Sequence, residues 1–184
     1  MNRIFLPLGS ISVIFLMIAF VLGLQIDDPK VLDRAVQQGV QNHFLAALAA
    51  LFFATLVHAI VLTYFMGTGR WLEETSTAYR LPPTAYEASK AIKYRVIPAM
   101  CGCFLLLVIT GAFGAAADPG SPVQFQGWLG FSPTAWHRTL AIITIVANVG
   151  MHYVEYLALF RNGEIIEGVM TEVRRIRQEK GLAV

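Results

Sequence analysis

The chain has little charge and few of the side chains with which soluble enzymes do chemistry. Of its 184 residues only 14% are charged while 56% are hydrophobic, and the mean hydropathy is +0.59, which is too apolar for an ordinary soluble domain. Its two cysteines, Cys101 and Cys103, are two residues apart in one apolar run. They point to different sides of a helix, so they cannot bridge each other and are predicted to be small packing residues.

Several kinds of functional site are excluded by what the sequence lacks. It has no Cys-x-x-Cys-His motif for covalent haem attachment, no flavin or nucleotide fingerprint and no ligand set for an iron–sulfur cluster. The segment Gly67-Thr68-Gly69 is too short for a phosphate loop, and we expect it to let the chain turn at a membrane surface. The net charge is only +2, and no nucleic-acid partner is expected.

Four apolar runs are each about as long as the hydrocarbon core of a bilayer requires. They cover residues 4–24, 44–66, 96–117 and 137–160. We expect the first run to be an uncleaved span, since no small-x-small cleavage site follows it. The sequence therefore predicts one integral membrane domain over residues 1–184, with an all-α fold in which four transmembrane helices form a bundle.

The basic residues lie on one side of this predicted bundle. Five follow the second span between residues 67 and 95, and five more lie in the tail after Phe160, whereas the segment 118–135 has none. The positive-inside rule then places both termini and the middle loop in the cytoplasm, as in a protein of a bacterial inner membrane.

Short amphipathic helices are predicted to flank the spans. Asp27-Asp28-Pro29 is typical of a helix start, and residues 29–41 are expected to run along the outer surface. On the inner side we expect helices at 71–79 and 84–95, and a cytoplasmic tail helix at about 164–180 with one apolar stripe. This tail helix lies on the membrane, docks a partner subunit, or is simply solvated.

The four histidines form two pairs with equal spacing. His43 and His58 lie on the second apolar run and His137 and His152 on the fourth, 15 residues apart in each case. This separates the imidazoles of a run by about 22 Å along a helix. Spans two and four run parallel, so His43 and His137 share an outer depth and His58 and His152 share an inner one. Histidines inside a membrane need a partner and are functional candidates.

Two imidazoles that face each other across a bundle can bind a haem iron from both sides, which suits electron transfer. Small residues on the other spans leave room for such a cofactor: Gly9 and Gly102 near the inner pair, and Gly23, Gly111 and Gly114 near the outer pair. Ordinary close helix packing also explains these glycines. Arg138 is placed to hold a haem propionate, although a surface arginine would look the same.

This arrangement resembles the N-terminal four-helix, haem-binding half of cytochrome b from quinol:cytochrome c oxidoreductases. The resemblance covers residues 4–160 and depends on the histidine positions and on Gly9 and Gly23, which are 14 residues apart. It implies two haem b groups as cofactors, with His43, His58, His137 and His152 as the iron ligands. The sequence departs from the family in its histidine spacing of 15 and in lacking the second half, which carries the quinol-oxidation motif.

We therefore predict a dihaem b-type cytochrome subunit that carries electrons across the membrane between a quinone pool and a partner redox protein. A single haem on His58 and His152 is the alternative within this class. The alternative of a different class is a haem-free accessory or scaffold subunit of a larger membrane complex.

Glu155 is the single acid in the four runs and follows His152 by three residues, on the same helix face. It either relays protons beside a quinone or, the interpretation we favour from the sequence, pairs with an interfacial cation such as Arg70, Lys93 or Arg95. One acid is too few for a di-iron carboxylate site, and it argues against a pump or channel.

Overall fold

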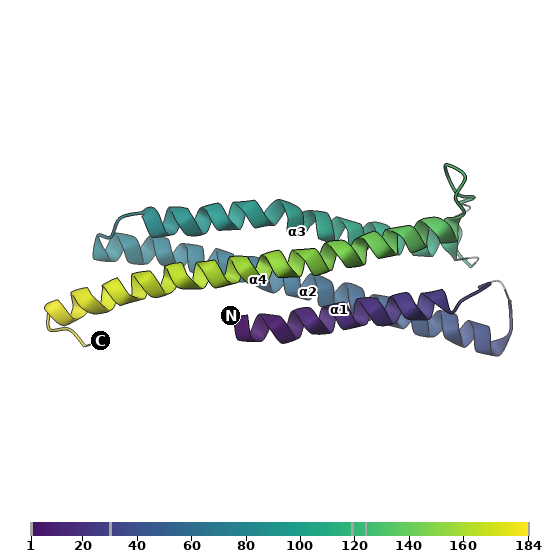
Figure 1. Cartoon of the computed structure of the whole chain (residues 1–184), viewed down its shortest axis with the longest axis horizontal. Coiled ribbons are helices and arrows are strands. Elements are labelled where there is room, and N and C mark those ends of the chain that lie inside the picture. The colour runs from purple at the N-terminus through teal and green to yellow at the C-terminus, as the bar shows by residue number, and fades with distance from the viewer. Residues whose placement is uncertain (1, 30, 119, 124, 184) are drawn as a thin grey trace.

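Four long α-helices make up the fold of the chain. The computed structural model describes residues 2–29, 31–118, 120–123 and 125–183. The helices are α1 (Asn2–Leu24), α2 (Arg34–Tyr79), α3 (Thr84–Ala117) and α4 (Pro133–Glu179), shown in Figure 1. Each contains a stretch long and apolar enough to cross a membrane. The predicted all-α fold with four membrane-spanning helices is thereby confirmed.

The predicted flanking helices are helical, but they are not separate elements. Residues 71–79 continue α2, residues 84–95 continue into α3, and the tail 164–180 is the last part of α4 up to Glu179. The turn expected at Gly67-Thr68-Gly69 is wrong, because these residues lie inside α2. A helix interior tolerates glycine at a cost of about 1 kcal/mol, whereas an actual break needs a stronger signal, which Pro82 and Pro83 supply between α2 and α3.

The start of α2 also differs from the prediction. The helix begins at Arg34 rather than at Pro29, and its cap is Asp33, whose carboxylate accepts hydrogen bonds from the backbone N–H groups of Ala35 and Val36. An N-cap carboxylate satisfies amides that have no partner within the helix. The short helix expected at 29–41 is therefore the first part of α2 from Arg34 onwards.

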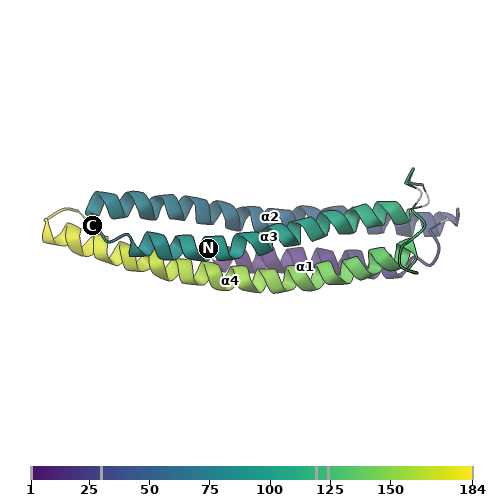
Figure 2. The same ribbon diagram turned by 90° about the horizontal axis from the view of Figure 1, so that it is seen from above.

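The helices form two hairpins that pack side by side. α1 packs against α2 in the first hairpin, and α3 packs against α4 in the second. Between the hairpins, α2 contacts both α3 and α4, and α1 contacts α4. α1 begins about halfway along the bundle, and α2, α3 and α4 continue well beyond its N-terminus (Figures 1 and 2). α2 has 46 residues and is about 69 Å long, more than twice the thickness of a hydrocarbon core.

The part beyond α1 is a three-helix extension with its own small core. We define it as residues 70–79 of α2, 84–92 of α3 and 163–179 of α4. Its centre is made by the buried side chains of Leu72, Val169 and Val173, with Trp71, Tyr79 and Ile166 packed around them. Where the extension joins the spans, buried Asn162 accepts a hydrogen bond from Ser89 (2.6 Å) and donates one to Thr68 (3.1 Å). One amide thus connects α2, α3 and α4.

At the opposite end, aromatic side chains gather where α4 begins. Trp136 stacks on Trp128 and donates its indole N–H to the carbonyl of that residue (2.9 Å). Phe113, Phe125 and Phe131 add further ring contacts. Tryptophan side chains are enriched at membrane–water interfaces. We call this region, residues 120–123 and 125–136, the aromatic segment.

Candidate functional site

The four histidines meet as two pairs between α2 and α4. The ring centroids of His43 and His137 are 6.0 Å apart, and those of His58 and His152 are 5.3 Å apart. Each pair takes one imidazole from each hairpin. The inner pair is buried, with 5% and 7% of the two residues exposed, and the outer pair is half-buried. Two parallel helices thus present histidines to each other at two levels of the bundle.

In the outer pair, backbone carbonyls fix the orientation of both rings. His43 Nδ1–H donates to the carbonyl of Ala19 on α1 (2.8 Å), and His137 Nδ1–H donates to the carbonyl of Thr110 on α3 (3.1 Å). A backbone carbonyl can only accept, so each ring carries its proton on Nδ1. The other nitrogen, Nε2, is then available as a ligand, which is the usual arrangement of metal-binding histidines.

Two glycines bring α1 and α3 close to the outer rings. A Cβ atom added at Gly23 would lie 2.9 Å from Cε1 of His43, and one added at Gly114 would lie 2.9 Å from Cε1 of His137. Such distances are too short for real side chains, so each glycine is needed for its helix to approach the imidazole. The sequence placed both glycines at the outer level, and the structure shows that each packs directly on a ring.

The two hairpins repeat one arrangement at many matched positions. On α1 and α3, residues 91 positions apart match. These are the intrahelical prolines Pro7 and Pro98, the ring-contacting glycines Gly23 and Gly114, and Ala19 and Thr110, whose carbonyls accept hydrogen bonds from the outer histidines. On α2 and α4, positions 94 apart match, beginning with the histidines. Buried residues fall in the same register on these two helices, at positions 50, 54, 57, 58, 61 and 65 and again at 144, 148, 151, 152, 155 and 159. The outer site is therefore two-fold symmetric in its contacts.

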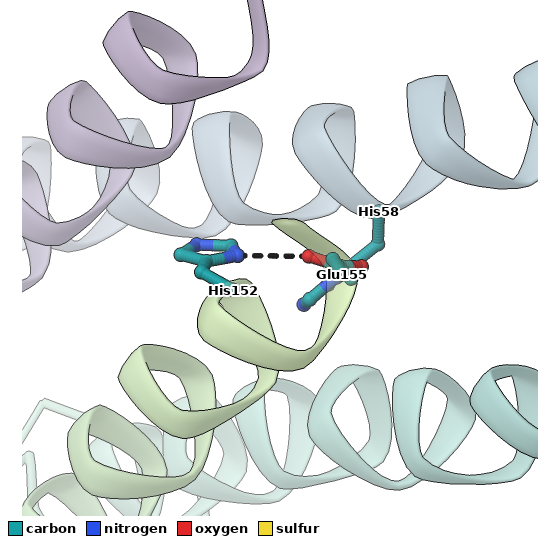
Figure 3. Close-up of side chains that lie close together, drawn as sticks. All are labelled: His58, His152 and Glu155. Atoms are coloured by element: carbon teal, nitrogen blue, oxygen red, sulfur yellow. Dashed lines mark hydrogen bonds and ion pairs between the residues drawn. The ribbon is translucent and has the colours of Figure 1, made fainter. Parts of the chain in front are cut away.

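The inner pair departs from this symmetry because a carboxylate joins its two rings. Figure 3 shows Glu155 of α4 beside both imidazoles. His58 Nδ1–H donates to Oε1 of Glu155 (2.6 Å), and His152 Nδ1–H donates to Oε2 (3.0 Å). Glu155 is fully buried, with 0% of its surface exposed. Its predicted pairing with an interfacial cation is therefore wrong. The cation-rich segments that were expected to supply its partner lie nearer the three-helix extension, whereas the Glu155 side chain points into the bundle.

The remaining nitrogens of the inner rings face neutral groups at longer distances. His58 Nε2 lies 3.2 Å from Oδ1 of Asn148, and His152 Nε2 lies 3.3 Å from the hydroxyl oxygen of Ser12 on α1. Both partners are completely buried. The amide oxygen of Asn148 can only accept, so His58 carries a proton on Nε2 as well as on Nδ1. A metal ion at the inner level would have to displace that proton, together with a bond to a neutral partner that is weaker than the charge-assisted bonds to Glu155.

Polar side chains of α3 and α4 connect the two levels. Asn148, which contacts His58, donates to the carbonyl of Thr144 (2.8 Å), and the Thr144 and Thr110 hydroxyls share a hydrogen bond of 2.7 Å. The Thr110 carbonyl then accepts from His137. The matching positions of α2 are Ala50 and Ala54, so this polar chain belongs to the second hairpin.

The other predicted cofactor residues lie as follows. Gly9 is buried against the inner level, where an added Cβ would be 3.9 Å from His152. Gly102 and Gly111 are exposed and have open space around them. Arg138 is exposed at the outer end of α4, next to His137. Their roles beside a haem stay predictions.

The distances between the ring centres can be compared with those that a shared metal ion requires. Two imidazoles that bind one ion at about 2 Å on opposite sides have ring centres roughly 6 Å apart. The outer pair has this separation. The inner pair is closer, and its Nε2 atoms point at Asn148 and Ser12, so both rings would have to turn as well as separate to hold one ion. Imidazole nitrogen suits iron as well as zinc and copper. Together with the ring-orienting carbonyls and the glycine cradle, the residues fit a bis-imidazole haem.

The inner level also offers a three-ligand set. One ligand atom each from His58, His152 and Glu155 lie within 4.8 Å of one another, and two histidines with one carboxylate can bind a non-haem metal ion. Sequence reasoning gave Glu155 a place beside the inner pair only as a proton relay, one of two alternatives, and it did not include Ser12. The spacing of three between His152 and Glu155 was a signal for the first of these, whereas contacts between distant helices had none.

Comparison with family models, with curated proteins and with solved structures gives no significant match to the chain. Its function is therefore inferred from the geometry of the two histidine levels.

Proposed function

We propose that the chain is a transmembrane electron carrier that holds haem b at two levels between α2 and α4. His43 and His137 would bind the outer haem iron and His58 and His152 the inner one, in each case through Nε2. A bound haem supplies reversible one-electron transfer, and two axial imidazoles leave no open position for oxygen or substrate. Donor and acceptor would be a quinone in the lipid and a partner redox protein.

The observation that supports this proposal most is the orientation of the outer rings. The ring centroids of His43 and His137 are 6.0 Å apart, and both rings point Nδ1 at a backbone carbonyl. A histidine that serves only in packing needs neither a fixed tautomer nor a matched partner on the other hairpin. The same combination of carbonyl, glycine and histidine occurs in both hairpins. Chance packing around one histidine does not explain this repetition.

The protein's residues do three things for such a cofactor. The backbone carbonyls and Glu155 orient the four rings. Gly23 and Gly114 allow the outer rings to be clamped from α1 and α3. The apolar helices exclude water from the inner level. The levels are about 22 Å apart along α2 and α4, so a pair of redox centres would cover most of the hydrocarbon core.

The distribution of basic residues supports an orientation for this carrier. The three-helix extension and both termini would lie in the cytoplasm of a bacterium, and the aromatic segment at the start of α4 would lie outside the inner membrane. The extension is the surface we assign to a partner protein on the cytoplasmic side.

The test is the haem content of the protein purified in detergent. We expect a reducible b-type spectrum and about two haems per chain. His58→Ala and His137→Ala should each remove one haem, from the inner and the outer level respectively. Tyr153→Phe is a matched control, since Tyr153 adjoins His152 on α4 but is 65% exposed, and it should keep both haems.

Two results would contradict the proposal. A colourless preparation from cells supplied with haem would favour the haem-free accessory subunit. One haem together with one tightly bound non-haem metal ion that His58→Ala and Glu155→Ala both release would assign the inner level to the three-ligand set.

A further inference from the structure

The hydrogen bonds behind the histidines differ between the two levels. At the outer level, the two Nδ1–H groups donate to two neutral backbone carbonyls, at 2.8 and 3.1 Å. At the inner level, both Nδ1–H groups donate to the two oxygens of one side chain, Glu155, at 2.6 and 3.0 Å. Two N–H donors on two separate oxygens match an ionised carboxylate, which only accepts. The inner rings therefore have a charged acceptor and the outer rings have none.

This difference comes from a single position of the repeat. Glu155 corresponds to Val61 of the first hairpin, and both are completely buried in the same layer of the bundle. The packing of that layer thus accepts an apolar side chain on one helix. A buried acid is costly unless it is paired, so its presence on the other helix calls for a role that valine cannot fill.

We propose that Glu155 is the residue that sets the midpoint potential of the inner haem below that of the outer haem. This inference rests on the proposed function, because it assumes that the inner imidazoles are iron ligands. Glu155 acts through His58 and His152 and does not touch the iron itself, so it is a positioning residue for both axial ligands.

The physical reason is the effect of the acceptor on the ligand. A carboxylate that accepts the Nδ1 proton of an imidazole raises the basicity of the opposite nitrogen. A more basic axial ligand stabilises oxidised iron more than reduced iron, and the potential of the couple falls. Hydrogen bonding to axial ligands is one of the ways in which proteins adjust haem potentials. Here one carboxylate acts on both axial ligands of the same haem.

The order of the two midpoint potentials would set the direction of electron transfer through the protein. If both haems are bound and the inner potential is the lower one, transfer of one electron from the inner to the outer haem would be favourable, and no proton or other atom would have to move with it. The donor then belongs at the end of the bundle that carries the three-helix extension, and the acceptor at the end that carries the aromatic segment.

Redox titration of the full chain in detergent tests this. Glu155→Gln removes the charge at nearly constant shape, and Glu155→Val places the residue of the matching position of α2. We expect both variants to keep two haems, to raise the lower midpoint potential by at least 59 mV and to leave the higher one unchanged. A shift of 59 mV is a tenfold change in the reduced-to-oxidised ratio of a one-electron couple. The low-spin signal of the inner ferric haem in electron paramagnetic resonance should shift as well.

Cys103→Ser is the matched control. Cys103 is buried on α3, its thiol contacts the carbonyl of Ala147, and its counterpart on α1 is Ser12. This variant should leave both potentials in place. The proposal is overturned if the two Glu155 variants keep both haems at unchanged potentials, or if both lose the inner haem, since Glu155 would then hold the site together instead. A wild-type protein without haem would instead refute the proposed function.

Discussion

Gly114 packs directly against the ring of His137: a Cβ atom at this glycine would lie 2.9 Å from Cε1 and 3.3 Å from Nδ1 of the imidazole. Gly23 has the same relationship to His43 on the other hairpin. Because backbone carbonyls hold both rings, neither ring can swing away from a new methyl group without losing a hydrogen bond.

Gly23→Ala and Gly114→Ala should therefore each weaken haem binding at the outer level. Overpacking of this kind costs about 1–3 kcal/mol, which corresponds to roughly a tenfold to hundredfold loss of affinity. Haem-to-protein ratios during dilution or competition with a haem acceptor measure this loss. Gly67→Ala and Gly150→Ala are the controls, since both glycines are exposed and an added Cβ meets no atom within 4 Å at either position. Equal losses in all four variants would contradict the ring-clamping role.

Replacement of Asn162 should loosen the junction between the spans and the three-helix extension. In Asn162→Ala the buried Ser89 hydroxyl loses its acceptor, at a cost of about 1–3 kcal/mol for the group left unsatisfied. The Thr68 hydroxyl loses one bond but keeps its bond to the Tyr64 carbonyl. We expect a lower unfolding midpoint in detergent with an unchanged haem spectrum, because the junction does not contact the histidines.

A second buried hydroxyl provides the comparison for Asn162. Within the residues that the structure describes, the Ser76 hydroxyl is buried without a hydrogen-bond partner. Ser76→Ala should therefore leave the unfolding midpoint unchanged or raise it slightly, since no bond is lost. A destabilisation equal to that of Asn162→Ala would mean that the amide network is not what stabilises the junction.

The orientation of the chain can be tested by labelling in whole cells. With Cys101 and Cys103 replaced by serine, Ala78→Cys places an exposed thiol in the extension and Val123→Cys places one in the aromatic segment. A membrane-impermeant maleimide added outside intact cells should label position 123 and not position 78, and disruption of the membrane should expose position 78. The reverse pattern would refute the cytoplasmic placement of the extension.

The sequence was sufficient for the fold class because membrane spans are set by long apolar runs, which are a local property. It was less reliable for helix ends. The stretch from Gly67 to Trp71 combines glycine with the start of a charged segment, and this marks the membrane surface without ending α2. Likewise Pro98 lies inside α3. Composition changes where the solvent changes, whereas a helix ends only where its hydrogen bonds do.

For the site, the relative depths of the histidines could be predicted from their spacing and from the direction of the spans. The sequence did not reveal that Glu155 turns inward. From the sequence, an acid near the membrane interface is equally consistent with an ion pair to a nearby cation and with a side chain that points into the bundle. Sequence reasoning also missed Ser12, whose contact with His152 joins residues 140 positions apart. Such contacts follow from helix packing and rotation.

Because each hairpin donates one imidazole to each level, two identical copies of one hairpin, facing each other, would already supply both levels with complete pairs. What fusion into one chain adds is the freedom to make the halves unequal. A homodimer that acquired an acid at the position of Val61 would acquire it twice, and two buried carboxylates would then compete for the same two N–H groups. A single covalent chain can carry a single charge there, and in that way two halves with matched histidines acquire polarity.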